Sequence, residues 1–384
     1  MAKKAVFRKI LFWTVLTLNI IAACMLFFAF LAGHIQPSSS GLIVFCGLTF
    51  FYWLIANFVF ILVWLFWHYR FCLISIIVIL LNINTIDRHF QFRGTDVPEN
   101  CPNSVKVMSY NCNLFGIYTD NNLSKRREDL TKIINQLQAT QPDILCFQEY
   151  FWDLGESLNF HTTDKIASNL GLDENKEHIF QYFLDTTQRK TCYGLAIFSK
   201  YKIVNSGVVF RDKTANSIVF VDIKFRDDTV RVYNAHLASL QMTPTDYNIS
   251  KQITTNKIQD PRFNKNAKKL YHKVADASTA RQLQAQTLKK HINECHYPVI
   301  VCGDFNDTPA SYCYNHIAKG LKDTFRECGK GKGTTYHGDA LPNNRIDYIL
   351  HSPCYMSYGY TVHDDLNVSD HYPIHTTISL RKKK

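Results

Sequence analysis

The N-terminal quarter of the chain carries two long apolar runs without a charged side chain. The first run covers residues 10–33 and the second covers residues 41–67. About 20 apolar residues in a helix cross the core of a bilayer, so each run predicts a transmembrane helix. A third apolar run, residues 71–86, falls short of that length and predicts either a third span or a helix lying in the interface. We therefore expect a membrane region over residues 1–93 with two or three transmembrane helices.

The basic residues around these runs predict the orientation of the chain in the membrane. Four of them precede the first run: Lys3, Lys4, Arg8 and Lys9. Arg70 separates the second and third runs, whereas residues 34–41 contain no Lys or Arg. Lys and Arg favour the cytoplasmic side, which places the N-terminus and Arg70 there. Three spans, the arrangement we favour, put the rest of this integral membrane protein on the non-cytoplasmic face. Two spans would put it in the cytoplasm.

The pattern of apolar and polar residues changes after residue 93. Residues 94–103 are polar, contain two prolines and predict a linker. Residues 104–380 then alternate short apolar strands with amphipathic helices. Strands are expected at residues 105–110, 144–147, 195–198, 218–225, 230–234, 299–302 and 346–351, and helices at 127–137 and 280–292. Strands outnumber helices and many are joined by short turns, which favours an α+β sandwich over an open parallel sheet.

The charge of the chain is unevenly distributed. The 384 residues include 43 Lys and Arg against 32 Asp and Glu, a formal net charge of +11. Residues 1–93 hold seven basic and one acidic side chain, and residues 381–384 form a basic tail. The body between them is nearly neutral, so the total does not indicate a basic nucleic-acid-binding domain. One segment, residues 251–273, has seven basic and one acidic side chain. It is either a solvated helix and loop or a surface facing anionic lipid or nucleic acid.

The cysteines predict neither a zinc site nor a disulfide framework. Nine of the 12 cysteines lie at or after Cys101, an odd number, and no two are separated by two residues. Cys146 and Cys302 fall inside apolar strand patterns, where small buried thiols are common. Free thiols suit a cytoplasmic domain, which counts against the three-span arrangement.

Polar residues recur where the expected strands begin or end. They are Asn111, Gln148, Glu149, Asn234, His236, Asp304, Asn306, Asp347, Asp370 and His371. Each alone reads as a turn former, but six such strand ends in one chain predict a site. Carboxylate and amide oxygens suit Mg²⁺, and histidines beside carboxylates suit acid–base chemistry. Together these groups favour metal-assisted hydrolysis of a phosphoester.

Seven motifs in order carry a family resemblance: NCNLF, PDILCFQEY, YGLAIFSK, YNAHL, VIVCGDFND, NNRIDYIL and SDHYPI. The chain resembles the endonuclease/exonuclease/phosphatase (deoxyribonuclease I-like) superfamily over residues 104–380. The resemblance implies a four-layer α/β/β/α sandwich, two sheets face to face with helices outside. It also implies Mg²⁺ as the cofactor, with Mn²⁺ as its substitute.

The resemblance also implies roles for individual residues. Glu149 would be the main metal ligand, with Asn111 and Asp370 supporting the metal site. Asp304 would orient the attacking water or contact the metal, and Asn306 would hold a phosphate oxygen.

Two histidines complete the catalytic set that the resemblance implies. His371, oriented by Asp347, would act as general base or phosphate contact. His236 would bind the phosphate or protonate the leaving oxygen, with Asn234 as a substrate contact beside it.

One departure from the family pattern concerns the partner of His236. In the deoxyribonuclease branch a Glu orients the equivalent histidine, but residues 189–193 contain no acidic residue, and Asp185 is not clearly aligned. This puts a mechanism close to that of the deoxyribonucleases in doubt. Arg345, Asp323 and Tyr336 also fit family-like positions, and we expect them to be scaffold.

Three functions remain open from the sequence. The favoured one is a membrane-anchored Mg²⁺-dependent hydrolase of lipid head groups or small phosphoesters. The alternatives are a membrane-tethered nuclease and a catalytically silent binding protein. The expected partners are membrane lipids and a phosphoester substrate; nucleic acid is less favoured and no protein partner is expected. The catalytic set is shared across the superfamily and does not identify the substrate.

Overall fold

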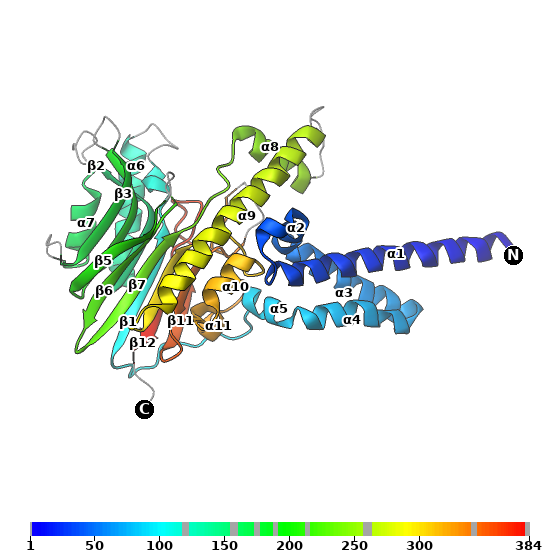
Figure 1. Ribbon diagram of the computed structural model, residues 1–384, viewed down its shortest axis with the longest axis horizontal. Coiled ribbons are helices and arrows are strands. Elements are labelled where there is room, and N and C mark those ends of the chain that lie inside the picture. The colour runs from blue at the N-terminus through cyan, green and yellow to red at the C-terminus, as the bar shows by residue number, and fades with distance from the viewer. Residues whose placement is uncertain are drawn as a thin grey trace.

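The fold was obtained as a computed structural model (Figure 1). It describes residues 2–116, 123–153, 160–172, 177–186, 191–211, 216–255, 263–338 and 344–380. The basic tail 381–384 lies outside these residues.

Two six-stranded sheets form the centre of the soluble part. The first sheet has the strand order β11 (Met356–Val362), β12 (Ile374–Ser379), β1 (Ser104–Asn111), β2 (Ile144–Asp153), β4 (Thr191–Ser199) and β3 (Ile179–Thr186). The second has the order β5 (Ile203–Phe210), β6 (Ile218–Phe225), β7 (Asp228–His236), β8 (Val299–Asp304), β10 (Asp347–His351) and β9 (Lys322–Asp323). Apolar side chains from both sheets, among them Val107, Ile197, Val232 and Ile300, fill the space between them.

Helices cover the outer face of each sheet (Figure 1). On the first sheet they are α6 (Leu123–Thr140) and α7 (Thr162–Asn169), and on the second α9 (Phe263–Asn293) and α10 (Tyr312–Ala318). The other described helices of the soluble part are η3 (Asn113–Gly116), α8 (Pro244–Thr255) and α11 (Thr324–Cys328). The predicted four-layer α/β/β/α sandwich is confirmed. The expected helix 280–292 proves to be the second half of the 31-residue α9.

The strand directions bring six strand ends to one edge of the sandwich. In each sheet two central strands are parallel, β1 with β2 and β7 with β8. Their outer neighbours β12 and β10 run antiparallel to β1 and β8. The carboxyl ends of β1, β2, β7 and β8 therefore lie at the same edge as the amino ends of β10 and β12. This geometry gathers the polar residues that follow or precede these strands.

The N-terminal region is a bundle of apolar helices that projects from the sandwich (Figure 1). Its elements are α1 (Ala2–Ala32), η1 (Pro37–Ser39), α2 (Gly41–Leu48), α3 (Phe50–Trp67), η2 (Tyr69–Phe71), α4 (Cys72–Leu81) and α5 (Ile83–His89). Two helices, Lys3–Ala32 and Phe50–Trp67, are long and apolar enough to cross a membrane. The segments Tyr69–Leu81 and Ile83–His89, bent by 60°, make a third if the pair is one span.

The expectation of one continuous span over residues 41–67 is wrong. The helix is interrupted at Thr49. The hydroxyl of Thr49 donates to the carbonyl of Phe45 at 2.7 Å and accepts from Nε1 of Trp53. Helix α2 leaves the direction of α3 and packs against α1, where Gly47 lies so close to Ala32 that a Cβ at 47 would be 2.7 Å from the Ala32 Cβ. Only residues 50–67 of the run form a membrane-length helix.

Buried polar side chains link the apolar helices. Asn19 of α1 donates to Ser75 of α4 at 2.7 Å and accepts from Nε1 of Trp64 of α3 at 2.8 Å. Asn82, between α4 and α5, donates to the carbonyl of Leu26 at 3.2 Å. Hydrogen bonds of this kind hold helices together where lipid provides no competing partner, so they specify a three-helix arrangement.

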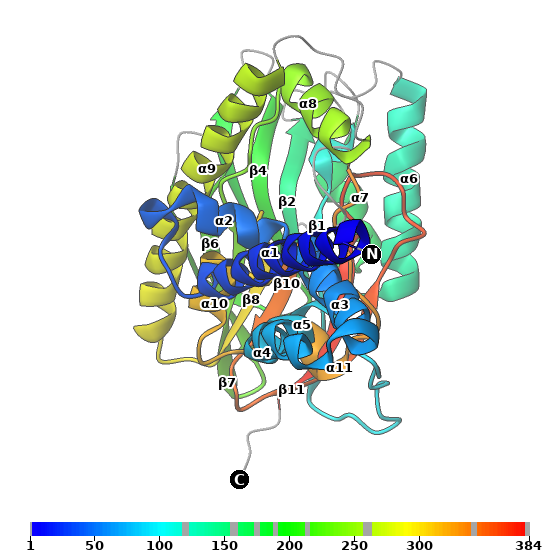
Figure 2. The ribbon, with the colours of Figure 1, turned by 90° about the vertical axis from the view of Figure 1, so that its right-hand side faces the viewer.

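The apolar bundle contacts the sandwich through its own polar ends. Nη2 of Arg345 donates to the carbonyl of Arg88 at 2.8 Å, and Arg326 pairs with Asp87 at 2.6 Å. Ser38 of η1 donates its N–H to Gln282 of α9. Figure 2, from the side of the bundle, shows α2 between α9 and α1, in front of the sheets. The linker 94–103 contains no helix or strand and hydrogen-bonds to the sandwich through Thr95.

Candidate active site

A histidine–carboxylate pair stands where β10 begins and shortly before β12. Nδ1 of His371 lies 2.9 Å from Oδ2 of Asp347, and both residues are buried. The backbone N–H groups of Ile346 and Asp347 donate to the hydroxyl of Thr335 at 3.0 and 3.1 Å, which fixes the start of β10. The backbone N–H of His371 donates to the hydroxyl of Ser369 at 3.1 Å. The pair is thus held from both sides, and its carboxylate fixes the orientation of the imidazole ring.

Asp304 is at the centre of the site. It ends β8 and is fully buried. Its Oδ1 accepts from the N–H of Asn306 at 2.7 Å, and its Oδ2 accepts from the amides of Asn111 at 3.0 Å and Asn306 at 3.2 Å. The same Oδ2 lies 3.7 Å from Nε2 of His371 and 3.8 Å from Nε2 of His236. One carboxylate therefore connects residues from both sheets.

The glycine before Asp304 allows β8 to approach β7 closely. Gly303 has a φ of +144°, and a Cβ built there would lie 1.9 Å from the carbonyl oxygen of Ala235. No side chain fits at that distance. The close approach aligns His236 with Asp304 in the strand register.

A β-bulge aims Glu149 into the site. The pairing of β2 with β4 shifts between Phe147 and Tyr150, and Glu149 has a φ of +50°. A bulge redirects a side chain that regular pleating would place elsewhere, and a positive φ in a residue other than glycine marks local strain. Oε1 of Glu149 lies 3.4 Å from the amide of Asn111 and 3.6 Å from Nε2 of His236.

Burial and neighbouring charges shift the pKa values of the site. Burial raises the pKa of Asp304 and of Glu149, and the nearby Asp370 raises that of Glu149 further. Burial alone lowers the pKa of His371, but the carboxylates of Asp347 and Asp304 outweigh it and raise that pKa to about 10. The site thus concentrates negative charge around one imidazolium.

The donor atoms fit a hard divalent cation. Glu149 and Asn111 are adjacent, and Asp370 joins them through Asn113, whose amide donates to Oδ1 of Asp370 at 3.1 Å. Oδ1 of Asp347 is buried and accepts no hydrogen bond from any described residue. Buried carboxylates with raised pKa values and an unsatisfied oxygen are what a bound cation stabilises.

The most compact group of possible ligand atoms differs from the set predicted for the metal. It consists of Asp304, Asp347 and His371, whose ligand atoms all lie within 4.8 Å of one another. Two of its members, Asp347 and His371, already hydrogen-bond to each other. The predicted ligands Asn111, Glu149 and Asp370 line the neighbouring part of the same site.

Asn234 does not face the site as predicted. It is fully buried between the sheets, and its amide donates to the carbonyls of Phe147 at 2.8 Å and Ala196 at 3.1 Å. Its Oδ1 accepts from Gln148 at 2.7 Å. The hydrogen bonds that a substrate contact requires are used to join β7 to the other sheet, so the expected substrate role of Asn234 is corrected to a structural one.

Several residues at the site were not anticipated from the sequence. Asn113 and Ser369 position Asp370 and His371, and Thr335 holds the start of β10. A second asparagine two residues after Asn111 was a visible signal for Asn113; Thr335 had none, because it lies in a loop far along the chain.

Two of the three residues expected to be scaffold pair with each other, and the third lies at the site. Arg345 and Asp323 form a buried ion pair at 2.8 Å. The ring of Tyr336 lies 5.2 Å from that of His371, at the site itself. Residues 189 and 190 of the segment without a Glu lie outside the described residues.

The N-terminal apolar bundle contributes to a crevice beside Asn306. A narrow crevice is bounded by Asn306 and Tyr336 on the sandwich and by Val44 and Leu48 of α2. Tyr271 and Ala275 of α9 pack against Gly41 at the start of α2. A helix of the apolar bundle therefore forms part of the surroundings of a residue predicted to bind phosphate.

Comparison with known families agrees with the fold. The Endonuclease/Exonuclease/phosphatase family matches residues 108–371, and the chain belongs to this family. Members of the family are generally phosphoester hydrolases that use a divalent metal ion. Residues 8–89 match a domain of unknown function, DUF8431. No curated protein matches the chain.

Solved structures share the fold at low sequence identity. An endonuclease/exonuclease/phosphatase structure from Beutenbergia cavernae is 16% identical, with a TM-score of 0.50 over 72% of each chain. A family protein from Leptotrichia buccalis is 15% identical and covers 73% of this chain and all of its own, with a TM-score of 0.48. The human Nocturnin catalytic domain with bound sulfate anion is 20% identical and covers 72% of this chain and 94% of its own, with a TM-score of 0.47.

Proposed function

We propose that the chain is a membrane-anchored, Mg²⁺-dependent hydrolase of phosphoesters, acting on lipid head groups or on small phosphoesters at the membrane surface. The observation that carries this proposal is the crevice shared by Asn306 and Tyr336 with Val44 and Leu48 of α2. A substrate whose phosphate meets Asn306 has an apolar helix of the membrane bundle directly beside it. A phospholipid has both a phosphate to meet Asn306 and apolar acyl chains to meet α2.

The proposed roles follow from the distances in the site. Asp347 holds Nδ1 of His371, which leaves Nε2, 3.7 Å from Asp304, to face the reacting phosphate. Asp304 orients the attacking water. The amide of Asn306, which donates to Asp304 and to the carbonyl of Leu237, exchanges one of these hydrogen bonds for one to a phosphate oxygen. His236 protonates the leaving oxygen.

Glu149, Asn111 and Asp370 are the residues we assign to the cation. A bound Mg²⁺ polarises the phosphoryl group and stabilises the charge that develops on its oxygens. Oxygen ligands without a thiolate favour Mg²⁺, and Mn²⁺ as its substitute, over zinc.

The basic first half of α9 supports a lipid substrate. Lys265, Lys268 and Lys269 are exposed there, whereas Lys273 is paired with Asp246 at 2.7 Å. This half of α9 lies next to α2 and extends toward the bundle (Figure 1). Each Lys or Arg near an anionic leaflet contributes about 1 kcal/mol of attraction. Lys257 and Arg262 of the same basic segment lie outside the described residues.

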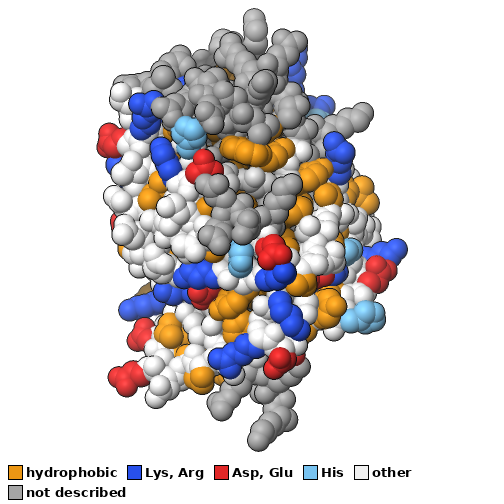
Figure 3. Space-filling model, turned by 90° about the vertical axis from the view of Figure 1, so that its left-hand side faces the viewer, with side chains coloured by type: hydrophobic (Ala, Val, Ile, Leu, Met, Phe, Trp, Pro, Cys, Tyr) orange, Lys and Arg blue, Asp and Glu red, His pale blue; other side chains and the backbone are white. Residues whose placement is uncertain are grey.

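The opposite face of the molecule gives no comparable support to a nuclease. Figure 3 views the molecule from the side away from the bundle, and there basic, acidic and apolar side chains are intermixed. A nucleic-acid groove requires basic side chains gathered along a track.

The bundle also supports the orientation that we propose, with the sandwich outside the cytoplasm. The N-terminus lies at the end of α1 remote from the sandwich (Figure 1). The pair α4–α5 leads the chain back to the sandwich, and we count this bent pair as one span, which makes three crossings. The basic N-terminus and Arg70 then occupy the cytoplasmic end. A reporter placed after residue 93 tests this: activity of a cytoplasm-only reporter would contradict it.

The experiment for the activity compares substrates on the full chain. Protein in detergent or vesicles is supplied with Mg²⁺ and anionic phospholipid, with a water-soluble phosphoester, and with single-stranded and duplex nucleic acid. We expect release of phosphate or phosphorylated head group from the lipid, lost in Glu149→Gln. Cleavage of nucleic acid with no release from lipid would replace the proposal by the nuclease alternative.

A further inference from the structure

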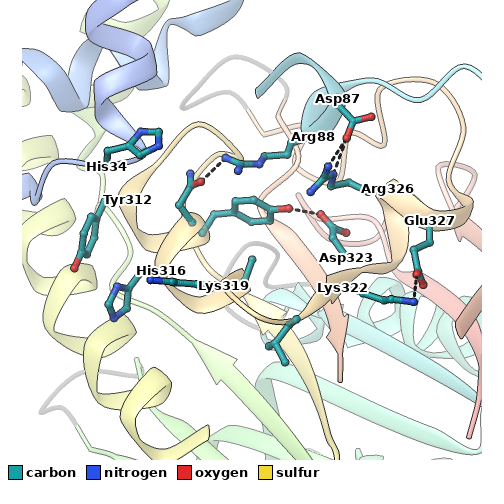
Figure 4. Close-up of a pocket in the computed structure, with 15 residues that line it drawn as sticks. His34, Asp87, Arg88, Tyr312, His316, Lys319, Lys322, Asp323, Arg326 and Glu327 are labelled. Carbon is teal, nitrogen blue, oxygen red and sulfur yellow. Dashed lines mark hydrogen bonds and ion pairs between the residues drawn. The ribbon is translucent and has the colours of Figure 1, made fainter. Parts of the chain in front are cut away.

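A second cavity lies at the junction of the membrane bundle and the sandwich. It has a volume of about 660 Å³ and is lined by the end of α1, the end of α5, and helices α10 and α11 (Figure 4). The bundle contributes Gly33, His34, Asp87 and Arg88. None of the residues lining it belongs to the predicted catalytic or metal-binding set, so it is separate from the active site.

The acidic residues of this junction cavity are each neutralised by a basic partner. Asp87 pairs with Arg326 at 2.6 Å, and Glu327 pairs with Lys322 at 2.8 Å, as the dashed lines in Figure 4 show. Asp323 pairs with Arg345 at 2.8 Å and accepts from the hydroxyl of Tyr314 at 2.6 Å. Each of these carboxylates thus has its closest cation in Arg326, Lys322 or Arg345, although Asp323 and Asp87 also attract the guanidinium of Arg88.

Two cations of the junction cavity are left over. Among the described residues, neither Arg88 nor Lys319 has a carboxylate within ion-pair distance. Arg88 donates from Nη1 to Asn315, and its buried Nε–H has no acceptor among the described residues. Lys319 is exposed, and no described residue accepts a hydrogen bond from its Nζ. Within the described part of the chain, the cavity therefore presents two cations that form no ion pair and one unsatisfied donor.

A histidine that lines the cavity also experiences positive charge. Burial lowers the pKa of His316, and the positive charges of Lys289 and Lys319 lower it further. An anion placed among these groups would satisfy the free donor of Arg88 and offset the repulsion.

The position of the junction cavity, at the ends of apolar helices, indicates which kind of anion can reach it. Its bundle residues follow the last apolar turns of α1 and end α5, where a membrane-spanning helix reaches the head groups. We propose that the junction cavity binds the phosphate of an anionic phospholipid head group, as a site distinct from the active site. Basic pockets at the ends of transmembrane helices hold lipid head groups in this manner. The bound lipid holds the bundle and the sandwich together.

The test measures lipid binding to the full chain in detergent by native mass spectrometry. The probes are short-chain phosphatidic acid, short-chain phosphatidylcholine and inorganic phosphate. We expect Lys319→Gln to weaken phosphatidic acid binding about fivefold, and Arg88→Gln by at least as much. The matched control Lys165→Gln removes an exposed lysine of α7, on the far side of the sandwich, and leaves binding unchanged.

Two results would overturn the proposal. The side chain of Lys319 is exposed and forms no hydrogen bond or ion pair with a described residue. Its substitution therefore leaves the fold intact, and unchanged phosphatidic acid binding in Lys319→Gln contradicts the site. Displacement of phosphatidic acid by an equal concentration of inorganic phosphate assigns the cavity to free phosphate rather than to a lipid. Neither readout depends on hydrolysis, so the outcome is independent of the proposed activity.

Discussion

Nδ1 of His371 lies 2.9 Å from Oδ2 of Asp347, although 24 residues separate them in the chain. The strand order places β12 in one sheet and β10 in the other, so this pair joins the two sheets at the edge that carries the site. The remaining site residues are arranged around it, with Asp304 3.7 Å from Nε2 of the same histidine.

The first prediction concerns the charge of His371. In the metal-free protein its pKa is raised to about 10, because Asp347 and Asp304 outweigh the effect of burial. Asp347→Asn removes one of these charges and lowers the pKa by about 1 to 3. An NMR titration of the imidazole measures it, with Asp364→Asn as the control, because this carboxylate lies in the same connection between β11 and β12 but acts on His363. A pKa that stays near 10 in Asp347→Asn would show that the pair is not electrostatically coupled.

The second prediction concerns the close approach of β7 and β8. Gly303→Ala places a Cβ 1.9 Å from the carbonyl of Ala235, which forces the strands apart and costs about 1–3 kcal/mol or more of unfolding free energy. Gly320→Ala is the matched control, because its φ is also positive, at +78°, but its Cβ meets nothing within 4 Å. Chemical denaturation should show a larger loss at 303; equal losses would refute the steric explanation.

The third prediction concerns the buried ion pair of Arg345 and Asp323. Both side chains are at most 2% exposed and lie 2.8 Å apart. Arg345→Met leaves the Asp323 carboxylate buried without its cation, at a cost of about 3–5 kcal/mol. Adding Asp323→Asn removes that charge, so we expect the double variant to unfold at a higher denaturant concentration than Arg345→Met. A double variant less stable than the single one would contradict this account.

The fourth prediction is a pH dependence of stability at Glu327. Burial alone would raise its pKa, but hydrogen bonds from His351, Lys322 and Ser357 lower it to about 2. A lowered folded-state pKa stabilises the protein above the ordinary value near 4.5 and loses that effect as pH falls toward 2. Glu327→Gln should therefore cost about 1–3 kcal/mol at neutral pH, with the difference shrinking in acid. A difference independent of pH would exclude a carboxylate effect.

Much of the fold followed from local sequence patterns. The strand expected at residues 218–225 matches β6. The strand expected at 105–110 is one residue shorter than β1 at each end, and that expected at 299–302 starts with β8 and ends two residues before it. Short apolar runs bounded by turn residues define such strands directly. The first half of α9 was missed because its residues 263–279 are largely polar; it packs on α8 and α2, not on the core.

The sequence predicted which strand ends carry the site residues, but not which of these residues lie close together. Asp304, Asp347 and His371 stand together because of the strand order, which no local pattern contains. Asn234 lies on the same face of β7 as His236 but two residues before the end of the strand, and it is therefore enclosed between the sheets. The break at Thr49 was invisible in the apolar run, since it depends on the packing of Gly47 against Ala32.

The most direct test of the account is head-group release by the full chain from anionic phospholipid vesicles with Mg²⁺, compared with Asp304→Asn. Asp304 accepts three hydrogen bonds and lies within 4 Å of His371 and His236 at the centre of the site, so its neutral isostere should reduce the rate about 10²-fold or more while vesicle binding is retained. Chelation of Mg²⁺ should abolish the release in the unmodified chain. Release that persists in Asp304→Asn at the unmodified rate, or that is absent while nucleic acid is cleaved, would contradict the central claim.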